Sequence, residues 1–415
     1  MIVKLLFSVV AAALTAASAS AATAPSEIKI GTLYASSGNY AAISMPVYTG
    51  LKFWVDQQNA DGGVFVKPYN KKIPIKLVSY DDQSNPATAG TLYNQLVTQD
   101  KVDILITDSG SVLTAPAVPV SLNHKMLLID QTGTGASFFN KGNPYIVLAA
   151  DPASTVWPKY LANFLIHDGP ALGIKRIALI YATNEFTGTQ ANAVRDYIKK
   201  SGAPLEFVYD QGVPTNTTNY SVLINNIKAA NPDAVIQMGY PNNDIAFLRN
   251  LQSNAVKFKF LFDIYPGLET SHLLQTVGAK GMLYGTTYVT SSDLSYKPEV
   301  GLNLEQYKKA WEAKNSGGKV DFGFNAVAGY TTGLIVESTL KTTDSMDQMA
   351  LRKAVGNLSG KLKTLDGTFE IDETGAQIGE VTPLGQLVSD GKDGVKFTVL
   401  YPHDVATGKI VYPAK

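Results

Sequence analysis

Polar, glycine-containing segments follow four apolar stretches of this sequence, and each stretch has the composition of a buried strand. Two of these segments lie in the first half of the chain, at residues 108–111 (DSGS) and 130–135 (DQTGTG). The other two lie in the second half, at residues 239–244 (GYPNND) and 263–267 (DIYPG). In an open parallel sheet, ligands bind beyond the carboxyl ends of the strands. The four segments therefore predict a binding site for a small polar or anionic solute.

Ser111 is the residue of these segments best placed to bind an anion. It opens a predicted helix, and a helix N-terminus offers free N–H groups and partial positive charge. Two other interpretations stay open. Serine at this position is more often a simple N-cap, and the hydroxyls of Thr132 and Thr134 could serve only in a turn.

The sequence lacks the spacing patterns of the common catalytic and metal sites. Its histidines are scattered, and neither a nucleophile elbow nor a phosphate-binding loop occurs. The S-x-x-K match at residues 316–319 lies in a glycine-rich link, and Gly133-Thr134-Gly135 lacks the third glycine of a dinucleotide site. We therefore expect no enzyme activity, no cofactor and no metal.

The composition limits which binding partners and which cellular compartment are compatible with the protein. The 415 residues contain no cysteine, which excludes disulfides and cysteine-based sites. Lys plus Arg and Asp plus Glu are 35 each, so the zero net charge does not favour a nucleic-acid partner. Hydrophobic residues make up 45%, which is enough for sizeable cores.

Residues 1–22 predict a secretory signal peptide. A basic residue, Lys4, precedes a short apolar run and then small residues with an A-x-A-like pattern. The run is shorter than the ~20 residues that span a membrane. We expect cleavage after Ala19, Ala21 or Ala22, which would release the chain into the periplasm; an uncleaved anchor is the alternative.

The two halves of the chain repeat one order of elements. In the first half, strands at 28–34, 73–80, 102–107 and 126–130 alternate with helices at 47–60, 86–100 and from about 111. In the second half, strands at 175–181, 205–209, 232–239 and 258–262 alternate with helices at 189–200, 218–230 and 243–254. Helices at 304–314, 325–341 and 345–355 and strands at 367–371 and 396–401 complete the chain.

This alternation predicts the α/β class, with two doubly wound parallel-sheet lobes joined by a hinge. We assign residues 27–148 and 292–376 to lobe 1, and residues 149–291 and 377–415 to lobe 2. A cleft between hinged lobes can close on a ligand.

The ordered segments resemble the type I periplasmic binding proteins, in particular the leucine/isoleucine/valine-binding group. The resemblance covers nearly the whole mature chain. It is carried by IKIGTLYASSG, GLKFWVDQQNADGGV, YDDQSNPATA, DILITDSGSVLTAPAVPV, LLIDQTGT, RIALIYATNEFTG, NPDAVIQMGYPNNDIAFLRNLQ and NAVAGYTTGLIVESTL. It implies two lobes, three crossover segments, ligand closure between the lobes and delivery of the ligand to an ABC-transporter permease.

The resemblance also implies ligand residues. The serine that holds the ligand carboxylate corresponds to Ser111, and the alanine–x–threonine stretch corresponds to Thr132-Gly133-Thr134. Two positions depart from the family pattern. A tyrosine of the second lobe is Phe186, and the acidic residue that pairs with the ligand's amino group is Asn243.

Because asparagine cannot neutralise an ammonium group, we expect a carboxylic acid without an α-amino group. Asp130 and Asp263 are alternative acidic partners. Aromatic residues at the predicted cleft edges suggest an aromatic ligand, although they could be ordinary packing residues: Tyr40, Phe186, Tyr240, Tyr265 and Tyr288.

The sequence therefore predicts a monomeric periplasmic solute-binding protein for a small carboxylate. A binding protein for branched-chain amino acids or amides is the alternative ligand class. A ligand-sensing domain for a receptor partner and an amidase-like hydrolase are the other functional classes.

Overall fold

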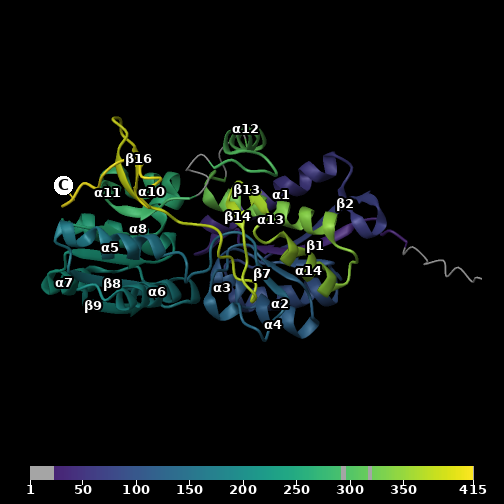
Figure 1. The fold of residues 1–415 in the computed structure, drawn as a ribbon, viewed down its shortest axis with the longest axis horizontal. Helices are drawn as coiled ribbons and strands as arrows, with labels where there is room; N and C mark the ends of the chain where they lie inside the picture. Colours follow the sequence, from purple (N-terminus) through teal and green to yellow (C-terminus); the bar gives the residue numbers. More distant parts are fainter. Residues whose placement is uncertain (1–22, 291–295, 316–319, 415) are drawn as a thin grey trace, which may run out of the picture.

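The computed structural model describes residues 23–290, 296–315 and 320–414, which form two α/β lobes side by side (Figure 1). The predicted fold class is confirmed. The predicted signal peptide and the predicted lobe boundary at 291/292 fall outside the described residues, and the division at that point stays a prediction. Among the described residues, no helix combines the length and apolar character needed to cross a bilayer.

The first lobe is built on five parallel strands in the order β4-β1-β5-β6-β7. Successive strand residues point to opposite faces of a sheet. Ile104 and Ile106 accordingly pack in one apolar cluster, and Leu105 packs in another. Both faces are therefore buried under helices. The strands are β1 (Ile28–Tyr34), β4 (Ile75–Asp81), β5 (Ile104–Ile106), β6 (Leu128–Asp130) and β7 (Ile146–Leu148).

The second lobe is built on seven strands in the order β16-β15-β12-β11-β10-β8-β9. The five strands from β12 to β9 are parallel, whereas β15 and β16 add an antiparallel edge. The strands are β8 (Arg176–Ala182), β9 (Glu206–Val213), β10 (Ala234–Met238), β11 (Leu261–Phe262), β12 (Thr286–Tyr288), β15 (Leu384–Ser389) and β16 (Val395–Tyr401).

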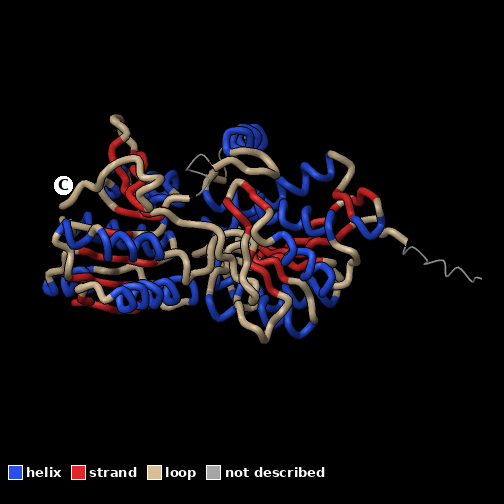
Figure 2. The backbone as a smooth tube through the Cα atoms, in the orientation of Figure 1, coloured by secondary structure: helices blue, strands red, loops and turns tan. Residues whose placement is uncertain are grey.

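Helices cover both sheets (Figure 2). Those of the first lobe are α1 (Ala41–Ala60), α2 (Pro86–Thr98), α3 (Gly110–Thr114), α4 (Ala117–His124), α12 (Leu304–Lys314), α13 (Phe324–Thr342) and α14 (Gln348–Leu358). Those of the second are α5 (Lys159–His167), α6 (Glu185–Ser201), α7 (Ser221–Ala230), α8 (Pro241–Ser253), α9 (Tyr265–Leu268), α10 (Thr270–Val277) and α11 (Ala279–Met282). Two small hairpins, β2 (Val64–Val66) with β3 (Lys71–Ile73) and β13 (Leu362–Thr364) with β14 (Gly367–Phe369), lie outside the main sheets.

Helices α1 and α13 approach each other at glycines. A Cβ built on Gly50 would lie 2.3 Å from the Ala326 carbonyl oxygen, and one built on Gly329 would lie 1.9 Å from the Val47 carbonyl oxygen. The two backbones are therefore in direct contact, and the contact ties the late helix α13 to the first lobe.

The chain runs between the two sheets after β7, after β12 and after β14. The first and last of these segments lie beside each other, because Ala153 N donates to Gln377 O at 2.8 Å and Thr382 Oγ1 donates to Trp157 O at 2.7 Å. Figure 2 shows the first and last of these connections as loops between the lobes. Such an arrangement can serve as a hinge.

Several element boundaries differ from those predicted. Helix α1 begins at Ala41 and contains Pro46, so the predicted start at residue 47 is six residues late. Helix α6 begins at Glu185, because Asn184 Oδ1 accepts from Phe186 N at 3.0 Å and from Thr187 N at 3.1 Å. The single helix expected from residue 111 is two short helices, α3 and α4.

Candidate functional site

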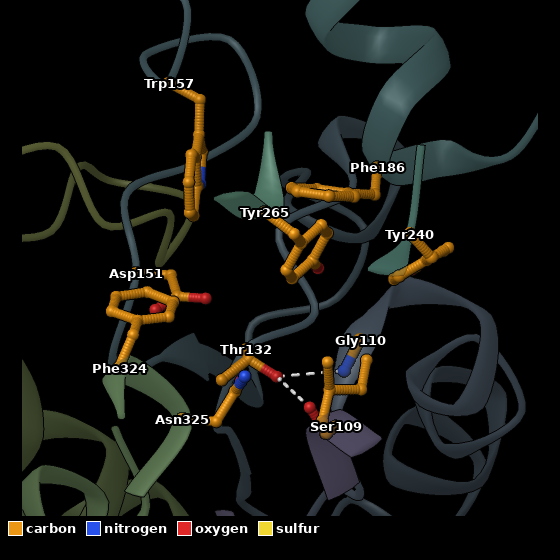
Figure 3. Close-up of a pocket in the computed structure, with 11 residues that line it drawn as sticks. Ser109, Gly110, Thr132, Asp151, Trp157, Phe186, Tyr240, Tyr265, Phe324 and Asn325 are labelled. Atoms are coloured by element: carbon orange, nitrogen blue, oxygen red, sulfur yellow. Dashed lines mark hydrogen bonds between the residues drawn. The ribbon is translucent and has the colours of Figure 1, made fainter. Parts of the chain in front are cut away.

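A small pocket lies between the lobes, and the space not filled by atoms in and around it, open solvent included, measures about 270 Å³. Its wall combines residues from both lobes and from the segment that follows β7 (Figure 3). The first lobe contributes Ile43, Ser109, Gly110, Thr132, Phe324 and Asn325; the second contributes Phe186, Tyr240 and Tyr265; the connecting segment contributes Asp151 and Trp157. The site thus needs both lobes.

Two hydroxyls and one backbone N–H form the polar wall of the first lobe. Gly110 N donates to Thr132 Oγ1 at 2.9 Å, and Thr132 Oγ1 lies 3.0 Å from Ser109 Oγ. Between them, the two hydroxyls use one proton for their mutual hydrogen bond. The second proton is then free to be donated to a ligand oxygen. The polarised chain makes that proton a good donor for an anion.

Gly110 allows this arrangement. Its φ is +77°, a conformation that favours glycine, and a Cβ there would lie 3.1 Å from Tyr240 Oη. The turn places Ser109, rather than Ser111, at the N-cap position of α3, which spans only five residues.

The remaining wall is mainly aromatic. The Phe186 ring centroid lies 5.5 Å from that of Trp157 and 5.5 Å from that of Tyr240. Phe324 lies 5.9 Å from Trp157, and Tyr265 lies 6.4 Å from Tyr240. All five rings are buried. The pocket therefore offers a mostly apolar space with a hydroxyl donor in one wall.

Of the residues predicted for the site, Thr132, Phe186 and Tyr265 line this pocket, and so does Tyr240. Ser111, Gly133 and Thr134 do not. Ser111 Oγ accepts from Gly135 N at 3.1 Å, Gly133 N donates to Asp130 Oδ1 at 2.7 Å, and the hydroxyls of Thr134 and Ser154 lie 2.7 Å apart. These three residues hold the loops together behind the wall.

Asn243 is engaged in the start of helix α8. Its Oδ1 accepts from Tyr240 N at 3.1 Å, and its Nδ2 donates to Thr215 O at 2.9 Å. The side chain therefore lies in the framework of the second lobe and outside the pocket wall.

Asp263 lies in a buried cluster of the second lobe. With its amide nitrogen turned toward the acids, Gln237 donates to Asp263 Oδ1 at 3.0 Å and to Asp244 Oδ1 at 2.7 Å. Burial raises the pKa of both carboxyl groups well above the usual range. Asp263 is thus not in the pocket wall.

Tyr288 and Tyr40 do not line the pocket but pack against aromatic residues that do. Tyr288 Oη donates to Gln190 Oε1 at 2.8 Å, and its ring lies 5.2 Å from Trp157. Tyr40 lies edge-on to Tyr240 at 5.2 Å. Both support aromatic residues that do line the site.

Seven lining residues were not predicted as site residues from the sequence: Ile43, Ser109, Gly110, Asp151, Trp157, Phe324 and Asn325. Ser109 lies in the segment already identified, two residues from Ser111. Asp151 follows β7 as the other polar segments follow their strands, but that strand itself went unrecognised. Phe324 and Asn325 come from α13, far along the chain, and Asn325 Nδ2 donates to the Glu269 carboxylate of the second lobe.

Asp130 lies buried beside the pocket and makes stability depend on pH. Its Oδ1 accepts from Thr107 Oγ1 at 3.0 Å and from Gly133 N at 2.7 Å. Burial raises its pKa from 3.8 to about 7. The pKa of Asp130 is higher in the folded protein than in the unfolded chain. Its contribution to the free energy of unfolding is therefore fully present below pH ~4 and is lost as the pH rises through 7.

We therefore expect Asp130→Asn to lose less stability than the wild type between pH 4 and pH 8, because the amide cannot ionise. Thermal unfolding of both proteins across this range would measure the difference. Equal losses in the two proteins would show that Asp130 is ionised in the folded state throughout.

Within the described part of the chain, no three His, Cys, Asp or Glu side chains are grouped so that they could hold a metal ion. The pocket's polar groups are hydroxyls, an amide, an indole N–H and one carboxyl group. This donor set suits an organic solute.

Comparison with known proteins supports the same class. The profile of the periplasmic binding protein family matches residues 27–392. The chain is 25% identical over 417 residues to Leu/Ile/Val-binding protein homolog 7 of Brucella suis biovar 1, covering 97% of this chain and 98% of that protein.

Two solved structures share the fold. The branched-chain amino acid transporter substrate-binding protein of Streptococcus pneumoniae, in complex with isoleucine, is 19% identical with a TM-score of 0.71, covering 90% of this chain and 100% of that one. An ABC-transporter solute-binding protein of R. palustris, in complex with benzoate, is 17% identical with a TM-score of 0.71, covering 94% and 97%. The chain therefore belongs to the periplasmic binding protein family, whose members are non-enzymatic solute-binding proteins.

Proposed function

We propose that the pocket binds a small carboxylic acid with an aromatic body and no α-amino group. The observation that carries the proposal is the Gly110–Thr132–Ser109 chain, which leaves one hydroxyl proton for a ligand carboxylate. A hydrogen bond to a charged group contributes about 1.5–3 kcal/mol. The five buried rings provide a matching apolar space for the body of the ligand.

Asn243, which the resemblance places where the family's acidic residue pairs with a ligand amino group, offers no charge for such a group. This position is uncharged, and both ends of its amide are used by the second-lobe framework. Neither Asp130 nor Asp263, the alternative acidic partners, belongs to the pocket wall.

One observation favours a second candidate, a branched-chain amino acid. The carboxyl group of Asp151 lines the pocket, and an acid could pair with an ammonium group. However, burial and the nearby Asp366 raise the pKa of Asp151 well above its usual range. A raised pKa disfavours the negatively charged form of Asp151, which favours the aromatic acid without an amino group.

The proposal includes location and partner. We propose that residues 1–22 direct export to the periplasm and are cleaved, and that the monomeric protein, once closed around its ligand, docks on the permease of an ABC transporter. The apolar run of residues 5–17 and the small residues after it support export.

A thermal-shift and calorimetric comparison of benzoate, benzamide and leucine tests the ligand class. At a ligand concentration 100 times its Kd, the stability gain is about 2.7 kcal/mol. We expect benzoate to stabilise the protein and the other two to have little effect, because benzamide lacks the charge and leucine carries an unpaired ammonium group. Stabilisation by leucine alone would reverse the assignment.

A further inference from the structure

Asp151 and Trp157 present two unused polar atoms on one side of the pocket. Asp151 is 4% exposed and Trp157 is 1% exposed. Within the described residues, neither Asp151 Oδ1 nor Trp157 Nε1 has a hydrogen-bond partner. Figure 3 shows the carboxyl group and the indole on the same side of the pocket, with their polar atoms facing its interior.

Such atoms call for a physical explanation, because buried polar groups in folded proteins are nearly always hydrogen-bonded. The ring of Trp157 packs against Phe186 and Tyr288, so its orientation is held by neighbours on two sides. Asp151 has a φ of +68°, a conformation uncommon for a residue with a side chain. Ring packing therefore fixes the Trp157 indole in the pocket wall, and the turn at Asp151 fixes where that residue joins the wall.

Two further acids lie near Asp151, and neither makes an ion pair among the described residues. These are Asp366, at the turn between β13 and β14, and Glu380, in the last connecting segment; each is 3% exposed. Burial raises the pKa values of all three groups, and repulsion from neighbouring carboxylates raises those of Asp151 and Glu380 further. These shifts favour the neutral form of the Asp151 carboxyl group.

The chemistry of the two atoms distinguishes among possible ligand groups. An indole N–H only donates, so the ligand group must be able to accept from Trp157. An ammonium group has no lone pair and would leave the indole unpaired. A hydroxyl, in contrast, can accept from an indole N–H and exchange a second hydrogen bond with a carboxyl group.

We propose that Asp151 and Trp157 form a second polar subsite that binds a ligand hydroxyl, so that the preferred ligand is a hydroxy-substituted aromatic carboxylic acid. This inference rests on the proposed function, in which the Ser109–Thr132 wall binds the ligand carboxylate. The Asp151–Trp157 subsite would then bind the hydroxyl substituent of the aromatic ring. Both residues are then specificity-determining.

Calorimetric titration of benzoate, 3-hydroxybenzoate and 4-hydroxybenzoate tests the subsite. We expect the wild type to bind the better hydroxybenzoate at least about 10-fold more tightly than benzoate, as one buried pair of hydrogen bonds implies. In Asp151→Ala and in Trp157→Phe, that ratio should fall to about one. Trp157→Phe keeps a ring and removes the N–H, and it keeps the test available if Asp151→Ala does not fold.

Trp311→Phe is the matched control. Trp311 is buried in the core of the first lobe, so this variant loses an indole without touching the pocket and should keep the wild-type ratio. If benzoate binds and a hydroxyl adds nothing, the subsite is refuted and the proposed function survives. If none of the three acids binds, the proposed function itself is wrong. Binding of leucine or terephthalate that depends on Asp151 would assign the subsite to an ammonium group or a second carboxylate instead.

Discussion

Replacing Thr132 with valine is expected to weaken the binding of an aromatic carboxylate by roughly 10- to 100-fold. The change keeps the side-chain shape and removes the hydroxyl that accepts from Gly110 N and lies 3.0 Å from Ser109 Oγ. The loss corresponds to one hydrogen bond to a charged group, about 1.5–3 kcal/mol. Titration calorimetry with benzoate would measure it, with thermal unfolding as a check on stability.

Thr134→Val provides a matched comparison two residues away. The Thr134 hydroxyl is buried and pairs with Ser154 at 2.7 Å, so its loss should lower stability and leave affinity within about a factor of two. The pair of variants separates two assignments of the ligand threonine, since the family resemblance points to Thr134 and the pocket wall contains Thr132. A larger loss of affinity in Thr134→Val would restore the assignment based on the resemblance.

Gly329→Ala is expected to destabilise the first lobe by roughly 3 kcal/mol or more, near or above the upper end for overpacked cores. The added methyl group would lie 1.9 Å from the Val47 carbonyl oxygen, and a backbone atom cannot move aside as a flexible side chain can. Helices α1 and α13 would have to separate. Chemical denaturation, followed by circular dichroism, would report the change in the free energy of unfolding.

Gly188→Ala is the control for this substitution. Gly188 lies within helix α6, and a Cβ there would meet no atom within 4 Å. Alanine is the better helix former, so this variant should gain about 0.5–1 kcal/mol. Equal changes in the free energy of unfolding for the two variants would mean that the close approach of α1 and α13 does not limit stability.

Elements with a clear local signal were predictable from the sequence. The strand at residues 28–34 and the helix at 304–314 have the bounds observed for β1 and α12. Helix α5 and strand β15 went unrecognised. Strand β15 contains glycine and is held by pairing with β12, residues 286–288, about a hundred positions earlier in the chain. Its local sequence is therefore a weak guide to its conformation.

The site was predictable at the level of its loops and for part of its side chains, since Thr132, Phe186, Tyr240 and Tyr265 line the pocket and Ser111 does not. The segments at 108–111 and 130–135 do supply the polar wall. Within them, the positive φ of Gly110 turns Ser109 toward Thr132, and a contact with Gly135 turns Ser111 away. The direction of a hydroxyl depends on such turns and on partners that are distant in the sequence. The type of a single residue therefore does not predict it.

The sequence by itself determined the class of the molecule: alternating strands and helices in two matched halves, and polar strand ends suited to a small solute. Only the tertiary structure decided which groups meet. Asp151 and Trp157 face the same pocket as Thr132, Tyr240 and Phe324 because two lobes and their connecting segment converge there. The physical reason is that periodicity reports which face of an element is buried, whereas hydrogen-bond partners arise from contacts between elements far apart in the chain.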